Sequence, residues 1–104
     1  MKKLSKVQLK QQAAVLSVAN TIEQQALTEL TGMEACWFDM DYDAFPGSLL
    51  VRFQFTSETE MLAAKSDLLT WQKRLSGLLL KKGILLKDMK KHLIFTLPDL
   101  EDEE

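Results

Sequence analysis

The chemistry that this sequence most clearly offers is a concentration of cationic side chains in its last third. Residues 61–92 carry eight lysine or arginine residues against two acidic ones, a net charge of +6. Such a cluster can contact phosphate groups, with binding that weakens as salt is raised. The candidate nucleic-acid-binding residues are Lys73, Arg74, Lys81, Lys82, Lys87, Lys90 and Lys91. The alternative is a solvated helix face whose lysine stems cover apolar surface.

Acidic residues are grouped elsewhere along the chain. Residues 32–60 and 93–104 each carry a net charge of −5, and residues 1–31 carry +2, so the total is −2. Segregation of this size says more about partners than the total charge does. It favours an anionic partner for the last third of the chain, with RNA or a ribonucleoprotein as the candidate.

Other residues that could perform chemistry give weaker signals. Asp39, Asp41 and Asp43 begin like a calcium-binding loop, but that loop needs glycine and glutamate where Ala44 and Leu50 stand. We therefore expect an acidic strand edge, which discourages edge-to-edge aggregation, and no metal site.

The single cysteine, Cys36, and the single histidine, His92, would need to be adjacent to form a nucleophilic pair. Cys36 falls on the apolar face of a predicted strand, where a thiol behaves as a small hydrophobic group. No glycine-rich phosphate loop is present, because the four glycines are far apart. We expect no enzyme, no cofactor and no small-molecule substrate.

The start of the chain has basic residues like a signal peptide, but Lys6, Gln8 and Lys10 interrupt the apolar region that should follow. One cysteine excludes an internal disulfide and is compatible with a reducing compartment. No apolar run is long enough to span a bilayer. The expectation is a cytoplasmic protein without a membrane partner, with one domain over residues 1–98 and an acidic tail over residues 99–104.

Two helices are predicted to position the cations. Apolar residues recur at spacings of three and four between Leu4 and Thr31, which predicts a first helix with a fraying, glutamine-rich start. Ser57-Glu58-Thr59-Glu60 is a capping box that begins a second helix. Trp71 falls on its apolar stripe, so core packing is expected for this ring. Ser76-Gly77 predicts a bend, and Gly83 is expected to end the helix.

Three segments alternate between apolar and polar residues and predict strands: 34–42, 48–56 and 93–97. The first two should pair as an antiparallel hairpin around a loop of about five residues at 43–47. The connector 84–91 has room for one helical turn. We expect the third strand to lie parallel to the first, after a right-handed crossover.

The fold class predicted from this order is α+β, a two-layer α-β-β-α-β sandwich with a three-stranded sheet covered by two long helices. Ala35, Trp37 and Leu50 fall on the outward faces of their strands. If helices cover only one side of the sheet, these residues form a partner surface, and homodimerisation is one use of it. The alternative is that the first helix or the N-terminal segment covers them.

The element order, with Leu75-Ser76-Gly77, the following Leu78-Leu79-Leu80-Lys81-Lys82 and a lysine-bearing connector before the last strand, resembles ribosome-binding factor A. That resemblance implies a type II KH-like fold and binding to structured RNA on the small ribosomal subunit. Two functions remain open: a non-enzymatic protein that contacts RNA through its lysine-rich helix and connector, and a protein–protein module or homodimer that uses the apolar sheet face.

Overall fold

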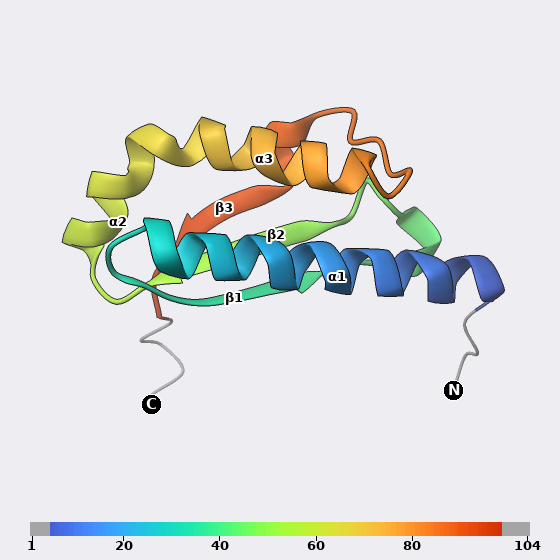
Figure 1. The fold of residues 1–104 in the computed structure, drawn as a ribbon, viewed down its shortest axis with the longest axis horizontal. Helices are drawn as coiled ribbons and strands as arrows, with labels where there is room; N and C mark the ends of the chain where they lie inside the picture. Colours follow the sequence, from blue (N-terminus) through green and yellow to red (C-terminus); the bar gives the residue numbers. More distant parts are fainter. Residues whose placement is uncertain (1–4, 99–104) are drawn as a thin grey trace.

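The computed structural model describes residues 5–98 (Figure 1). The protein has the predicted α+β fold, with the order helix, strand, strand, helix, strand. Its elements are α1 (Lys6–Glu29), β1 (Met33–Asp39), the 3-10 turn η1 (Tyr42–Ala44), β2 (Leu50–Phe55), α2 (Glu58–Ala64), the 3-10 turn η2 (Lys65–Asp67), α3 (Leu68–Leu80), the 3-10 turn η3 (Met89–Lys91) and β3 (Leu93–Thr96). The acidic tail predicted at residues 99–104 lies outside the described part.

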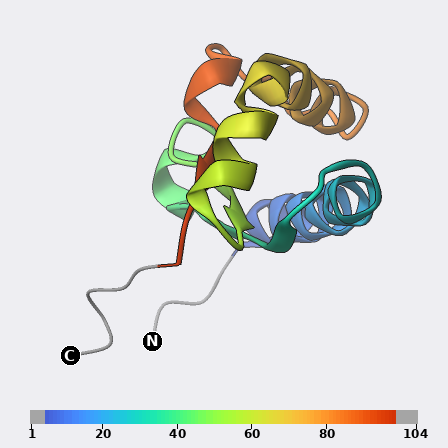
Figure 2. The same cartoon turned by 90° about the vertical axis from the view of Figure 1, so that its left-hand side faces the viewer.

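The helices α1 and α3 lie on the same face of the sheet (Figure 2). Their buried side chains and the inner face of β2 form one hydrophobic core, in which Ile22, Phe53 and Leu75 are almost completely buried. The predicted alternation holds in β2, where Val51, Phe53 and Phe55 are buried and the residues between them are partly exposed. The alternation of apolar and polar residues along this segment therefore predicted the inner face of β2 correctly.

Both ends of α1 are defined by local chemistry. Ser5 and Gln8 form a reciprocal capping box, with the Gln8 amide 3.1 Å from the Ser5 hydroxyl and the Ser5 amide 3.0 Å from the Gln8 side-chain oxygen. This capping pair, which the glutamine-rich composition concealed, stabilises the end of the helix for which fraying was predicted. At the other end α1 stops at Glu29, and its C-cap Leu30 is extended, with its amide 2.8 Å from the Ala26 carbonyl. Gly32 lies in the turn that follows, with φ +84°, and a Cβ there would clash with the side chain of Glu60.

The sheet order is β1-β2-β3, with β1 and β2 antiparallel and β2 and β3 parallel. The third strand is thus antiparallel to the first, and the predicted orientation was wrong. The crossover through α2 and α3 starts from β2, so β2 is the strand beside which it returns the chain. The hairpin is as predicted, but its loop spans residues 40–49 because β1 already ends at Asp39 and β2 begins only at Leu50.

The second helical segment is interrupted at Lys65–Asp67, not at Ser76-Gly77. The 3-10 turn there changes the direction of the chain between α2 and α3 (Figure 1). The expected long second helix is therefore two helices. Gly77 lies within the hydrogen-bonded α3, and a Cβ at this position would meet no atom within 4 Å. The glycine requires no special backbone conformation.

The end of α3 is as predicted. Gly83 has φ +82°, its amide lies 2.9 Å from the Leu80 carbonyl, and the Ile84 amide lies 3.0 Å from the Leu79 carbonyl. These two bonds form a Schellman motif, and the burial of Leu79 and Ile84 provides its usual apolar contact. The motif turns the chain into the connector that carries the last lysines.

Candidate nucleic-acid interface

Six of the seven predicted cations have exposed side chains along the C-terminal part of the fold. Lys73 lies on α3, Lys81 and Lys82 lie in the turn after it, and the others lie in the connector and η3, the orange and red segments of Figure 1. We call this set the lysine surface. Its members are Lys73, Lys81, Lys82, Lys87, Lys90 and Lys91.

One buried side chain holds the connector against α3. The side-chain nitrogen of Gln72 donates to the carbonyl oxygens of Lys90, at 3.2 Å, and Leu93, at 3.0 Å. Gln72 is itself buried in the middle of α3, next in sequence to Lys73. The backbone of η3 therefore lies beside α3, although 18 residues separate Gln72 from Lys90.

Within residues 5–98, no carboxylate forms an ion pair with any member of the lysine surface. Lys81 and Lys82 also lie at the C-terminal end of α3, where a cation is favoured by the helix dipole. This interaction with the dipole does not bury the ammonium groups, which stay exposed to solvent. The positive charge of the surface is therefore available to an external anion.

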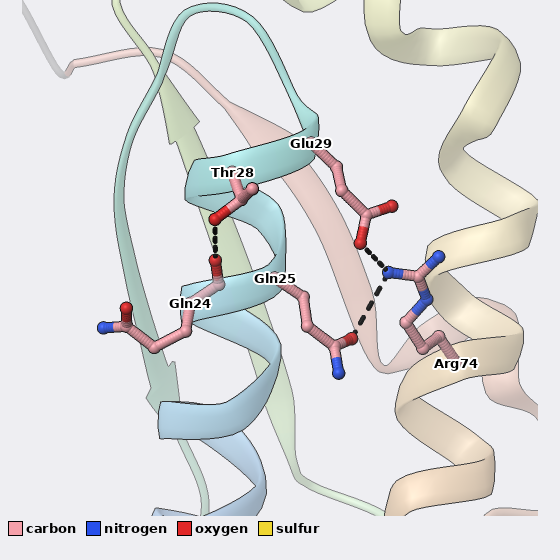
Figure 3. Close-up of polar contacts among 5 residues, drawn as sticks. All are labelled: Gln24, Gln25, Thr28, Glu29 and Arg74. Atoms are coloured by element: carbon pink, nitrogen blue, oxygen red, sulfur yellow. Dashed lines mark hydrogen bonds and ion pairs between the residues drawn. The ribbon is translucent and has the colours of Figure 1, made fainter.

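Arg74, the seventh predicted cation, has a different role. Its guanidinium Nη1 donates to the Glu29 carboxylate at 2.8 Å and to the Gln25 side-chain oxygen at 3.3 Å (Figure 3). The guanidinium also lies over the Trp71 ring, 4.1 Å from its centroid. Arg74 therefore links α3 to α1 through Nη1, and its place in the phosphate-contacting set stays a prediction.

Trp71 packs in the core, as predicted. Its ring meets Phe53 edge-on, with centroids 5.5 Å apart and planes at 73°. Because the indole is buried beneath Arg74, it is not available for stacking on a nucleic-acid base. The lysine surface therefore offers charge without an exposed aromatic ring from α3.

Two of the three predicted carboxylates near the hairpin loop, those of Asp39 and Asp41, have partners close by in the fold. Asp39 forms an ion pair with Arg52 on β2, and the Asp41 carboxylate accepts a hydrogen bond from the amide of Asp43 at 2.9 Å. Asp41 precedes η1 and caps it. Among residues 5–98, no group of three histidine, cysteine or acidic side chains is placed to hold a metal ion.

Cys36 and His92 are separated by β2, since Cys36 lies on β1 and His92 immediately precedes β3. Burial, with a smaller contribution from the negative charge of Glu23, raises the pKa of the Cys36 thiol to about 12. The thiol is therefore protonated at neutral pH. His92 is buried, and its Nδ1 lies 2.7 Å from the Leu49 carbonyl oxygen.

A pocket of about 320 Å³ lies between the hairpin loop and the connector. Its lining combines apolar groups, two members of the lysine surface, one acid and the buried histidine: Pro46, Gly47, Leu85, Leu86, Lys87, Asp88, Lys91 and His92. Sequence reasoning missed it, because the two sides come from segments about 40 residues apart. The one local signal was the apolar run Ile84-Leu85-Leu86 at the start of a connector rich in lysine, where it fits neither a helical nor a strand pattern.

The outer face of the sheet is the second feature that could contact a partner. Register pairs Arg52 with Trp37 on one side and with Ile94 on the other, so the three form a row across the sheet. Trp37 is 39% exposed and Ile94 is 37% exposed, while Ala35 and Leu50 are half-buried.

The first helix does not cover this row, because α1 lies on the opposite face (Figure 2). The predicted partner residues share this face, which α1 leaves uncovered, while the N-terminal segment of the alternative prediction lies outside the described residues. Ile94, which the same alternation places outward, belongs with them.

No helix within residues 5–98 has the length and apolar character needed to cross a membrane. Comparison of the chain with protein-family models, with curated proteins and with solved structures finds no match.

Proposed function

We propose that this protein is a small, non-enzymatic, cytoplasmic RNA-binding protein whose partner is a structured RNA or a ribonucleoprotein. The observation that carries the proposal is the lysine surface, six exposed cations without an ion-pair partner among the described residues. An unpaired cation can exchange solvent counterions for a phosphate without first breaking an internal ion pair. The proposal excludes Arg74 from the contacts, because Glu29 and Gln25 already accept its hydrogen bonds.

The element order supports the same class of partner through its resemblance to ribosome-binding factor A. That support is limited to the order, since the helical interruption lies at Lys65–Asp67 instead of at Ser76-Gly77. Fold and function are separable in general. The charge and accessibility of the lysine surface therefore carry the proposal.

The test is a titration of a fluorescently labelled structured RNA, followed by anisotropy at low and moderate salt. If each lysine of the surface meets one phosphate, the affinity falls by about 10³-fold between about 50 and 200 mM salt. The triple reversal of Lys81, Lys82 and Lys90 to glutamate should reduce the affinity by about 100-fold or more.

The matched control reverses three exposed lysines outside the surface, Lys6, Lys10 and Lys65. It changes the net charge by the same amount and should reduce binding by much less than the first triple variant. Equal losses in the two variants would show that net charge alone attracts the RNA. Absence of binding at the lower salt concentration would refute the proposed function.

A second candidate function is self-association through the outer face of the sheet. It is favoured by the row of Trp37, Arg52 and Ile94, in which two exposed apolar side chains flank a cation that Asp39 already neutralises. A two-fold dimer would bury the same patch on both copies. This candidate uses a different surface from the lysines, so each can be tested separately.

Sedimentation measurements of molecular mass test the second candidate. A dimer that becomes monomeric in Trp37→Glu or Ile94→Glu supports it. The control is Leu62→Glu, which places the same charge on an exposed apolar residue of α2 and should leave the mass unchanged. A wild-type protein that stays monomeric at millimolar concentration rules the dimer out.

A further inference from the structure

We infer that the pocket between the hairpin loop and the connector binds one nucleotide, with its base inside the pocket and its phosphate at the lysine rim. The nucleotide is either free or an unpaired residue of an RNA chain. The inference deepens the proposed function, because Lys87 and Lys91 belong both to the lysine surface and to the pocket. The pocket can also bind a free mononucleotide if the protein does not bind RNA, so the two proposals can fail separately.

The size and walls of the pocket suit a single planar ring system. Its volume of about 320 Å³ is at the small end of the range of roughly 300–1,000 Å³ for small-molecule sites. Pro46, Leu85 and Leu86 supply apolar walls. Leu85 is 65% exposed, so a large apolar side chain stands at the rim with little to pack against. A flat base placed beside it would remove that surface from water.

His92 provides a hydrogen-bonding group at the pocket. The residue is only 4% exposed, and its Nδ1 is engaged by the Leu49 carbonyl, which fixes the ring orientation. Its Nε2 has no protein partner within residues 5–98. Because no side-chain nitrogen or oxygen in that part of the chain is both fully buried and unpartnered, Nε2 must remain in contact with solvent. The pocket is the cavity that His92 lines.

Asp88 distinguishes a nucleotide from a simple anion. One carboxylate oxygen of Asp88 accepts the Lys90 amide at 3.3 Å, and the other oxygen has no partner in the described chain. A carboxylate in the lining disfavours an anion placed deep in the pocket, but it accepts hydrogen bonds from an N–H group. A ligand with N–H groups on a flat ring and a phosphate at its edge satisfies Asp88, His92 and the two lysines together.

The experiment titrates four ribonucleoside monophosphates and ribose 5-phosphate into the ¹⁵N-labelled protein and follows binding by NMR. At least one mononucleotide should bind about tenfold more tightly than ribose 5-phosphate, which carries the phosphate without the base. Binding should shift the Nε2 resonance of His92 more than its Nδ1 resonance, since only Nε2 is free to meet the ligand.

Two variants test the pocket itself. His92→Asn keeps a donor in the position of Nδ1 for the Leu49 carbonyl and removes Nε2. Leu85→Ser removes the apolar rim at an exposed position that the fold does not need. Each should weaken mononucleotide binding by about tenfold. The control Leu80→Ser changes a leucine of similar exposure, 58% against 65% for Leu85, that does not line the pocket, and the variant should bind mononucleotides normally.

The outcomes separate this inference from the proposed function. If the RNA titration succeeds but is insensitive to His92→Asn and Leu85→Ser, and mononucleotides bind no better than ribose 5-phosphate, the inference is overturned and the proposed function stands. If mononucleotides bind in the pocket and RNA does not, the inference stands for the free ligand and the proposed function falls. Weakening of both ligands by the pocket variants identifies an unpaired RNA nucleotide as the occupant.

Discussion

The seam between α1 and α3 and the connector after α3 use the same chemistry for different purposes. At the seam, Arg74 is held by Glu29 and Gln25 and covers Trp71, so its charge is consumed by the fold. In the connector, Lys87 and Lys91 have no ionic partner among the described residues. The comparison shows that cations from one charged run differ in whether the fold itself pairs them, and the proposed binding role rests on those that it leaves unpaired.

The largest expected effect lies at the centre of the seam. Trp71→Ala removes a fully buried indole that packs on Phe53 and supports Arg74, and should lower the free energy of unfolding by about 3–5 kcal/mol. Denaturant titration measures it. A loss below about 1 kcal/mol would mean that the ring is not part of the core.

A smaller effect is expected for the cation above that ring. Arg74→Met keeps much of the apolar stem but removes the partly exposed ion pair and the contact over Trp71, at a cost of about 1–2 kcal/mol in unfolding free energy. RNA affinity should stay within about threefold of the wild type. A large loss of RNA binding in a stable Arg74→Met protein would return Arg74 to the binding surface.

Gly77 lines the groove between the two helices and tests the continuity of α3. Gly77→Ala should raise the unfolding free energy by about 0.5–1 kcal/mol, because the helix is regular there and the added methyl group meets no atom. Thermal or denaturant unfolding of the two proteins shows whether the substitution raises or lowers the unfolding free energy. Destabilisation would instead indicate the bend that the sequence pattern suggested.

The smallest effect on stability is expected one residue before Arg74. Lys73→Ala should change the unfolding free energy by less than about 0.5 kcal/mol, since the side chain is exposed and unpaired. Its RNA affinity should nevertheless fall. The slope of the logarithm of the binding constant against the logarithm of the salt concentration should become less steep by about 1, the value for one phosphate contact. An unchanged slope would remove Lys73 from the lysine surface.

Much of the fold could be predicted because its signals are local. Alternation placed Val51, Phe53 and Phe55 inward. Gly83 marked the end of α3 and Gly32 marked the turn after α1, both through backbone conformations that favour glycine. These signals depend on neighbours within a few residues. They need no knowledge of the tertiary structure.

The errors arose where distant segments decide. A glycine at position 77 suggested a bend, yet the direction changes at Lys65–Asp67, where α2 gives way to α3 above the sheet. The ion pair of Arg74 had no local signal either, because its partner Glu29 lies 45 residues away in the sequence. The pocket could not be predicted for the same reason. It forms where the segments of Pro46 and His92 meet, and the sequence of neither segment indicates a pocket.

The amide of Gln72 has a consequence for how firmly a ligand can be held. By donating to the carbonyl of Lys90 within η3 and to that of Leu93 at the start of β3, it holds this backbone beside α3, so the backbone positions that carry Lys73 and Lys90 are set before any partner arrives. A partner would then have to order only the two exposed side chains, because the backbone beneath them is already ordered by the fold.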